Sequence, residues 1–400
     1  MKPIIIIGGG AIGSALSHDL TLRGFEVALF EKGELLSGTT GRHHGLLHSG
    51  GRYLLHDLET ARECWEENRI LKHIVPEGLE QNDGLFVALN DQDMSHMEAF
   101  LEGCREIDIP FRQLSPRQAL ALEPNLNSDL KAAIQIPDAT MDAWRLPLHF
   151  FTTARENGAK IHPFAEVTAI HREGKRVIGV MIMDHRTHQS AFYAGDIVVN
   201  AAGPWAGKIA AMLDIPLPVR PAPGVMVSVQ KRLTDMVINR LHPADDGDIV
   251  VPQRGLSILG TSTWLAEDPD RVNLPHDHIE CIRANCAEMI PSLTRLPVHA
   301  AWCASRPLIV RDPGEDPTKI SRTFDCLDHA DLDNIEGFVS VIGGKATTMR
   351  AMAEKTGDLI CKKTGRTNPC QTRDTRLIPY RRWYEGRLLF GRNFFTGKRS

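Results

Sequence analysis

The sequence predicts an α/β protein with two domains, and three observations lead to this fold class. The chain has 400 residues, whereas a single hydrophobic core rarely extends beyond about 300 residues. Residues 3–31 contain an apolar run, a glycine turn, a helical segment and a second apolar run, which is typical of a βαβ unit. Between 217 and 335, short strand-like runs alternate with proline-containing turns. This pattern predicts a mostly antiparallel domain inserted into the first.

Composition excludes several classes of protein. Apolar residues make up 42% of the chain, charged residues 24%, and the formal net charge is −4. These values are typical of a globular protein, and they argue against global disorder and against a nucleic-acid binder. The apolar run at 4–7 is too short for a membrane helix and lacks the features of a signal peptide. The eight cysteines include no C-x-x-C pair, so no metal site is predicted. We expect a cytoplasmic protein that associates peripherally with the inner face of the cell membrane.

The first apolar run is followed by the pattern G-x-G-x-x-G at Gly8, Gly10 and Gly13. The first glycine permits a tight turn, the second lets the backbone approach a pyrophosphate, and the third allows close packing of helix on strand. The next helix would point its N-terminus at the phosphates. Glu31 ends the second apolar run, where its carboxylate can accept hydrogen bonds from ribose hydroxyls. The pattern predicts a Rossmann-like dinucleotide-binding domain, for either FAD or NAD.

The segment 37–53 is the densest in functional residue types. Five glycines, three histidines and two arginines occur within its seventeen residues. Such a loop lets backbone amides approach a large planar or phosphorylated ligand. Because the loop comes soon after Glu31, it indicates a cofactor or substrate site.

Three segments resemble the FAD-dependent glycerol-3-phosphate dehydrogenases, above all the large catalytic subunit of the anaerobic type. They are TGRHHGLLHSGGRY at 40–53, SRPL at 305–308 and GGKATTMR at 343–350. A fourth, VVNAAGPW at 198–205, resembles the wider family that includes D-amino-acid and glycine oxidases. The resemblance extends to about residue 370. It implies an FAD-binding domain of the D-amino-acid-oxidase/glutathione-reductase type, with an inserted α+β substrate domain.

The expected domain division is discontinuous. The FAD-binding domain is expected at 1–85, 146–215 and 336–370, and the substrate domain at 86–145 and 216–335. The remaining segment, 371–400, carries eight lysines or arginines interleaved with aromatic residues. We expect this tail to dock to an anionic membrane surface or to an acidic electron-acceptor subunit. The alternative is a terminus that packs on its own domain.

The resemblance implies FAD as the cofactor and assigns residues to each part of it. Gly8, Gly10, Gly13 and Glu31 would hold the ADP half, and Thr40 with the backbone near Leu46 and Leu47 would line the flavin side. Val167 would meet the adenine, and Ala202 and Gly203 would line the cofactor edge. Gly343, Gly344 and Thr347 would approach the pyrimidine end and the ribityl chain. The cofactor-binding residues that the resemblance implies also include Ala11, Ile12, Lys32, Gly45, Lys345 and Ala346. A helix starting near Ala346 would aim its positive end at the flavin N1–C2=O region.

The implied reaction is oxidation of sn-glycerol 3-phosphate, or a closely related polyol phosphate, to the ketone by hydride transfer to flavin N5. The phosphate is a dianion, which arginine can contact through two hydrogen bonds. The implied substrate-binding residues are Arg52, Tyr53, Arg306 and Lys345, and the implied catalytic residues are His48 and Arg306. His48 would accept the hydroxyl proton, with His44 as the rival for that role and no role given to His43.

Three departures from the family pattern leave alternatives open. The anaerobic enzymes usually continue into a cysteine-rich domain that these 400 residues lack, so we expect electrons to pass to a quinone, to oxygen or to a separate subunit. Pro223 stands where the family often has lysine, and Met349 replaces a tyrosine. An FAD-dependent oxidase or dehydrogenase of hydroxy or amino acids, of the 2-hydroxyglutarate or glycine type, is therefore the alternative. A flavin-binding protein without turnover and an NAD-only dehydrogenase are further hypotheses, and the glycine-rich segments argue against the last.

Overall fold

The structure, a computed structural model, describes residues 2–243, 245, 247–311 and 323–385. Its first layer is a six-stranded sheet in the order β19-β20-β13-β1-β2-β9, with β19 antiparallel to β20 and the other neighbours parallel. The strands are β1 (Ile4–Ile7), β2 (Val27–Glu31), β9 (Lys160–Pro163), β13 (Ile197–Asn200), β19 (Phe324–Asp328) and β20 (Phe338–Gly343).

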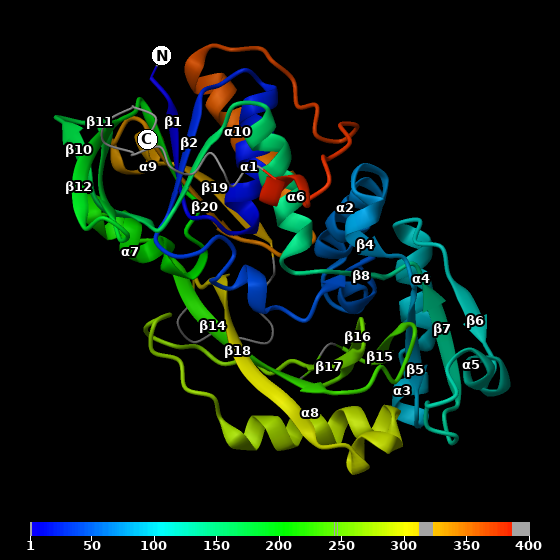
Figure 1. Ribbon diagram of the computed structural model, residues 1–400. Coiled ribbons are helices and arrows are strands. Elements are labelled where there is room, and N and C mark those ends of the chain that lie inside the picture. The colour runs from blue at the N-terminus through cyan, green and yellow to red at the C-terminus, as the bar shows by residue number, and fades with distance from the viewer. Residues whose placement is uncertain (1, 244, 246, 312–322, 386–400) are drawn as a thin grey trace.

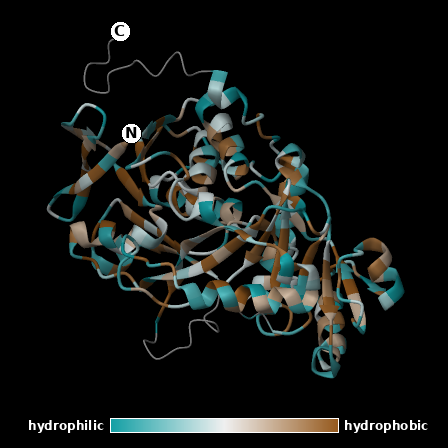
Figure 2. Ribbon diagram, turned by 60° about the horizontal axis from the view of Figure 1, so that its bottom comes forward, coloured by the Kyte–Doolittle hydropathy of each residue, from teal (hydrophilic) through white to brown (hydrophobic). Residues whose placement is uncertain are grey.

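The alternation of side chains along β1 separates two hydrophobic layers. Ile4 and Ile6 pack with a helical layer, whereas Ile5 and Ile7 pack with a second sheet, because successive strand residues point to opposite faces. A strand buried on both faces has a continuous apolar run, and Figures 1 and 2 show the helices on one side and the second sheet on the other. The helices are α1 (Ala11–Leu22), α6 (Arg145–Glu156) and α10 (Met349–Thr364), and the second sheet holds β10 (Ala165–Glu173), β11 (Arg176–Asp184) and β12 (Gln189–Ala194).

The second domain is an eight-stranded sheet in the order β18-β14-β17-β16-β15-β5-β7-β6. All neighbours are antiparallel except β15 and β5, which confirms the expected insertion. Helix α8 (His276–Met289) packs against one face of this sheet (Figure 1). The strands are β5 (Gly84–Ala88), β6 (Arg112–Leu114), β7 (Ala132–Ile136), β14 (Val219–Val229), β15 (Val237–Arg240), β16 (Ile249–Gln253), β17 (Leu256–Gly260) and β18 (Val298–Ile309).

A small sheet and further helices complete the described structure. The sheet has the order β3-β8-β4, with β3 (Leu46–Leu47), β4 (Leu79–Glu80) and β8 (Ala139–Met141). The other helices are α2 (Leu58–Ile74), α3 (Asp91–Ser95), α4 (Met97–Glu106), α5 (Pro116–Leu122), α7 (Ala206–Ala210), α9 (His329–Asp333) and α11 (Arg382–Glu385). The domain boundaries stay a proposal: β5 crosses the boundary proposed at 85/86, and β19 pairs with β20 from within the segment proposed for the substrate domain.

Residues 371–385 pack against the helical layer of the first domain. The backbone N–H of Leu377 donates to the carbonyl of Ile74 at 3.0 Å. The side chain of Trp383 is buried beside Phe151, and Arg155 donates to the Trp383 carbonyl at 3.0 Å. This part of the tail therefore packs on its own domain, whereas docking through 371–400 stays a prediction, since residues 386–400 lie outside the described residues. No helix in the described ranges combines the length and apolar character needed to cross a membrane.

Candidate active site

A cavity of about 1580 Å³ lies where the carboxyl ends of the parallel strands meet the eight-stranded sheet. The turn after β1, the end of β2, the turn after β13 and the end of β20 all contribute to its wall. Open α/β sheets bind ligands at this edge. The other wall includes β18 and the loop that follows β17.

The glycine turn leaves room for a ligand beside its backbone and for close packing of α1 on β1. Gly8 has φ +112°, and a Cβ added to it would lie 2.6 Å from the carbonyl oxygen of Ala201. A Cβ on Gly13 would lie 2.0 Å from the carbonyl oxygen of Gly8, so only glycine lets α1 approach β1 this closely. At the start of α1, the N–H of Ala11 donates to Thr40 Oγ1 at 3.0 Å. The turn therefore fits the pyrophosphate of FAD.

Glu31 is held against the glycine turn by the backbone. Its carboxylate accepts hydrogen bonds from the N–H of Gly9 at 2.7 Å and from the N–H of Gly33 at 2.9 Å. The carboxylate also lines the cavity, and each oxygen has a second lone pair for a ribose hydroxyl. Lys32 follows Glu31 and lies 4.9 Å from the ring centroid of Trp205.

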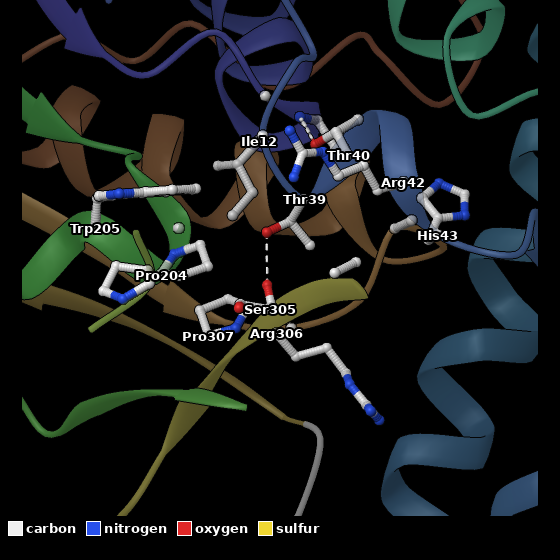
Figure 3. A pocket seen from close by; sticks show the side chains of 18 of the residues that line it. Ile12, Thr39, Thr40, Arg42, His43, Pro204, Trp205, Ser305, Arg306 and Pro307 are labelled. Atoms are coloured by element: carbon white, nitrogen blue, oxygen red, sulfur yellow. Dashed lines mark hydrogen bonds between the residues drawn. The ribbon is translucent and has the colours of Figure 1, made fainter. Parts of the chain in front are cut away.

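Both domains hold the segment 39–42 in place. Thr39 Oγ1 donates to the carbonyl of Ser305 at 2.5 Å, a contact drawn in Figure 3. Two indole N–H groups donate to neighbouring carbonyls: Trp144 to Gly41 at 3.1 Å, and Trp302 to Arg42 at 2.7 Å. Sequence reasoning missed both tryptophans, because each stands alone in the sequence with no motif around it.

The three histidines of this loop are kept neutral. Nδ1 of His43 accepts from the N–H of Gly45 at 2.9 Å, and Nδ1 of His44 accepts from the N–H of Leu46 at 3.1 Å. Burial lowers the pKa of His43 to about 4 and that of His44 to about 3. Burial, and then the positive charges around it, lower the pKa of His48 well below its usual value. The His48 ring lies 6.3 Å from the His44 ring and 5.4 Å from the Tyr53 ring, measured between centroids.

Arg52 reaches the same end of the cavity and is paired with an acid. Its Nη2 lies 2.6 Å from Asp248 Oδ1, and its Nη1 donates to Asn239 Oδ1 at 3.1 Å. Lys345 places its Nζ 5.2 Å from the ring centroid of Tyr53. Sequence reasoning also missed Asp248 and Asn239, which no local pattern connects to Arg52.

Arg306 reaches the cavity from β18 across Gly224. Figure 3 shows its side chain extending from the strand that carries Ser305 and Pro307. Its Nη2 donates to the carbonyl of Ser262 at 2.5 Å. A Cβ on Gly224 would lie 2.3 Å from this nitrogen, so the absence of a side chain at Gly224 leaves space for the guanidinium.

The structure brings nearly all the proposed site residues to one cavity. Three cofactor candidates are not among the lining residues: Gly13 packs α1 on β1, Gly45 makes a turn at φ +86°, and Leu47 is buried in β3. The helix expected from Ala346 begins at Met349, because a turn precedes it in which the N–H of Lys345 donates to Thr348 Oγ1 at 3.2 Å. The residues in the wall are Gly8, Gly10, Ala11, Ile12, Glu31, Lys32, Thr40, Leu46, His48, Arg52, Tyr53, Val167, Ala202, Gly203, Arg306, Gly343, Gly344, Lys345, Ala346 and Thr347.

Comparison with known proteins identifies relatives of this chain. The family model described as FAD dependent oxidoreductase matches residues 3–350. One subunit of the anaerobic glycerol-3-phosphate dehydrogenase of Haloferax volcanii is 41% identical over 387 residues, covering 94% of this chain and 66% of the relative. The corresponding subunit of the Escherichia coli K12 enzyme is 38% identical over 378 residues, covering 94% and 69%. The chain thus spans about two thirds of the length of these curated relatives.

Two solved structures show the same fold. The glycerol-3-phosphate dehydrogenase of Bacillus halodurans, complexed with FAD, aligns with a TM-score of 0.72 and 24% identity, covering 98% of this chain and 71% of that one. L-proline dehydrogenase of P. horikoshii aligns with a TM-score of 0.74 and 21% identity, covering 96% and 98%. The predicted fold and the FAD cofactor are confirmed. The chain belongs to the FAD-dependent oxidoreductase family, within which it is similar to one subunit of the anaerobic glycerol-3-phosphate dehydrogenases.

Proposed function

We propose that this protein oxidises sn-glycerol 3-phosphate, or a closely related polyol phosphate, to the ketone. The observation that carries the proposal is the convergence of Arg306, Lys345 and the neutral His48 at one end of the FAD cavity. A phosphorylated alcohol needs cations for its phosphate and a proton acceptor for its hydroxyl. The names of the two curated relatives support the same substrate.

Oxidation of a secondary alcohol removes a hydride from carbon and a proton from oxygen. Bound FAD supplies the hydride acceptor at flavin N5. His48 accepts the proton, because burial keeps its imidazole neutral and the surrounding cations disfavour its protonation before substrate binds. Within the described residues, no hydrogen bond occupies either ring nitrogen of His48, whereas its backbone N–H donates to Thr347 Oγ1 at 3.2 Å.

The cations have different tasks in this proposal. Arg306 and Lys345 contact the phosphate, since an arginine fork and an ammonium group are the usual donors to this dianion. The charge of Arg52 is balanced by Asp248, so Arg52 orients the substrate and adds little net charge. Tyr53 forms the wall between Lys345 and His48.

The electrons then leave through a quinone or through a separate subunit. Both curated relatives are named as one subunit of an enzyme, which supports an assembly with further polypeptides. The location that we propose is the cytoplasm, at the inner face of the cell membrane. The described part of the tail packs on its own domain, and docking to a membrane surface or to an acceptor subunit through 371–400 stays part of this proposal.

An anaerobic titration tests the proposal. Purified protein loaded with FAD is mixed with sn-glycerol 3-phosphate while the visible flavin absorption is recorded, and we expect this band to bleach. Inorganic phosphate is expected to compete with the substrate. Bleaching by 2-hydroxyglutarate or glycine, and none by polyol phosphates, would instead assign Arg306 to a carboxylate and overturn the proposed substrate.

A further inference from the structure

His44 lies next to the proposed base but is fixed in a different hydrogen-bonding state. The backbone N–H of Leu46 donates to Nδ1 of His44 at 3.1 Å. Since an acceptor nitrogen carries a lone pair, the single proton of this neutral ring is on Nε2. A second proton on Nδ1 would face the Leu46 N–H and break the contact. His44 can therefore donate through Nε2, and it cannot serve as the base without disrupting its loop.

The loop around His44 holds this geometry. Gln253 Nε2 donates to the carbonyl of Met141 at 3.1 Å, and the carbonyls of Gly45 and His44 lie 3.4 and 3.5 Å from the same nitrogen. Gly45 has φ +86°, and a Cβ on it would meet the Gln253 side chain. The orientation of the His44 ring is thus set by its contact with the Leu46 N–H, in a turn that the Gln253 side chain holds in place.

The ring of His44 faces the cationic end of the cavity. The charged groups that act on it are His43 from its own loop, Arg52 from the following turn and Arg306 from β18. The charged group that acts on His43 is Asp142 instead, so the two adjacent imidazoles lie in different surroundings. His44 lines the cavity, and no described residue forms a hydrogen bond with its Nε2.

The distance between the rings of His44 and His48 allows both to contact one ligand atom. Their centroids are 6.3 Å apart, with an angle of 76° between the ring planes. A shared oxygen would lie about 2.9 Å from a nitrogen of each ring. Adding the distance from that nitrogen to the ring centroid on each side is enough to span the separation of the two centroids.

We propose that His44 is a substrate-binding N–H donor, which hydrogen-bonds through Nε2 to the hydroxyl oxygen whose proton His48 accepts. This inference rests on the proposed function, because it assigns roles around the same reacting oxygen. As the proton leaves for His48 and the hydride for the flavin, negative charge that develops on this oxygen is stabilised by the fixed donor. The donor loses no proton itself, so the balance of the reaction is unchanged.

Three variants separate the donor from the loop contact. His44→Gln keeps an N–H donor near the position of Nε2, and His44→Leu removes it. His43→Leu removes the equivalent backbone contact, from Gly45 to Nδ1, at the neighbouring residue, and so measures the effect of loosening the loop. The FAD content of each holoenzyme is measured by absorbance. The values of kcat and KM for sn-glycerol 3-phosphate are then determined across pH with an artificial electron acceptor.

We expect His44→Leu to lower kcat about 10²–10³-fold, as for the loss of one donor to a developing oxyanion. His44→Gln should retain most of the activity, and His43→Leu should lose less than His44→Leu. Each variant should keep an acid limb of kcat/KM, since His48 is present, and this limb should move to higher pH when a neighbouring imidazole that lowers the pKa of His48 is removed. Equal losses in His44→Gln, His44→Leu and His43→Leu, or loss of the acid limb in His44→Leu, would overturn the proposal.

A measurement without substrate tests the same assignment. In the ¹⁵N NMR spectrum of the histidine-labelled holoenzyme, the His44 signals are identified by their absence in His44→Gln. We expect the Nε2-protonated form, with no titration from neutral pH to about pH 5. A proton on Nδ1, or titration in this range, would overturn the proposal even if sn-glycerol 3-phosphate fails to reduce the flavin. That failure by itself would overturn only the proposed substrate.

Discussion

Arg52 and Asp248 form an ion pair that joins the loop after β3 to the start of β16, with 2.6 Å between Nη2 and Oδ1. The side chain of Asp248 is 3% exposed and that of Arg52 is 12% exposed. The arginine that the sequence assigned to substrate binding is thus anchored by an acid of the eight-stranded sheet. An anchored guanidinium loses little conformational freedom when substrate binds, which favours affinity.

Asp248→Asn is expected to destabilise the protein by up to about 3–5 kcal/mol, because it leaves the buried charge of Arg52 without its counter-charge. Inorganic phosphate should restore part of this loss by supplying a negative charge in the cavity. The measurement is the Tm with and without phosphate, for this variant and for Asp91→Asn at the exposed Lys131 pair. If phosphate raises the Tm of wild type and of Asp248→Asn by the same amount, Arg52 does not face the anion site.

His48→Asn should lower kcat about 10²–10⁴-fold while FAD remains bound, because it removes the proton acceptor. The sign of the pH dependence follows from the lowered pKa of His48. The neutral form is active, so kcat/KM of the wild type should stay level from pH 7 to about pH 6 and fall only as pH drops through that lowered pKa. Stopped-flow reduction across pH measures this profile. An acid limb centred at the ordinary value of 6.5 would assign the base to an exposed group.

Gly13→Ala should prevent FAD binding or weaken it strongly. The added Cβ would lie 2.0 Å from the carbonyl oxygen of Gly8, so α1 would have to move away from β1 and from the pyrophosphate position. Gly207→Ala is the control, since a Cβ at this position in α7 meets nothing within 4 Å and alanine favours a helix. FAD content and Tm are measured for both. A Gly13→Ala protein with full FAD content would contradict the role of the turn.

Glu67→Ala should destabilise the first domain by about 3–5 kcal/mol, because it leaves Arg350 charged and buried without its main partner. Arg350 Nε lies 2.9 Å from Glu67 Oε2, and the two side chains are 0% and 2% exposed. Glu66→Ala is the control at the next residue. It breaks an exposed pair with Arg373, which should cost less than about 1 kcal/mol. Chemical unfolding followed by circular dichroism measures both, and similar losses would show that burial of the pair has no effect.

Local patterns in the sequence predicted the parts of the fold that depend on neighbouring residues. The strand, glycine turn and helix at the N-terminus needed only residues 3–31, and the structure has β1, α1 and β2 there. The sequence also predicts a helical stretch near 58–73, and the structure has α2 there, which Asp57 caps by accepting from the N–H of Thr60 at 3.0 Å. Capping and apolar spacing are local signals.

The contacts that orient the site are distant in sequence and could not be predicted in this way. Asp248 lies 196 positions from Arg52, and Trp302 lies 260 positions from Arg42. A single acid or a single indole has no periodicity, so only the packing of the two domains reveals its partner. The basic character of 371–400 suggested docking, whereas the burial of Trp383 and Leu377 places 371–385 against the first domain. The composition of a segment gives its charge, but it does not show which of its side chains become buried.

The order of strands in the parallel sheet also has a consequence for synthesis on the ribosome. β1 leaves the exit tunnel first, yet one of its two neighbours is β13, which begins at Ile197. One edge of β1 therefore stays unpaired until the residues of β13 have emerged. β20 adds the cavity wall at Gly343 later still. The nascent protein can enclose its flavin only after Gly343 has emerged, and chaperones are expected to shield the open edge until then.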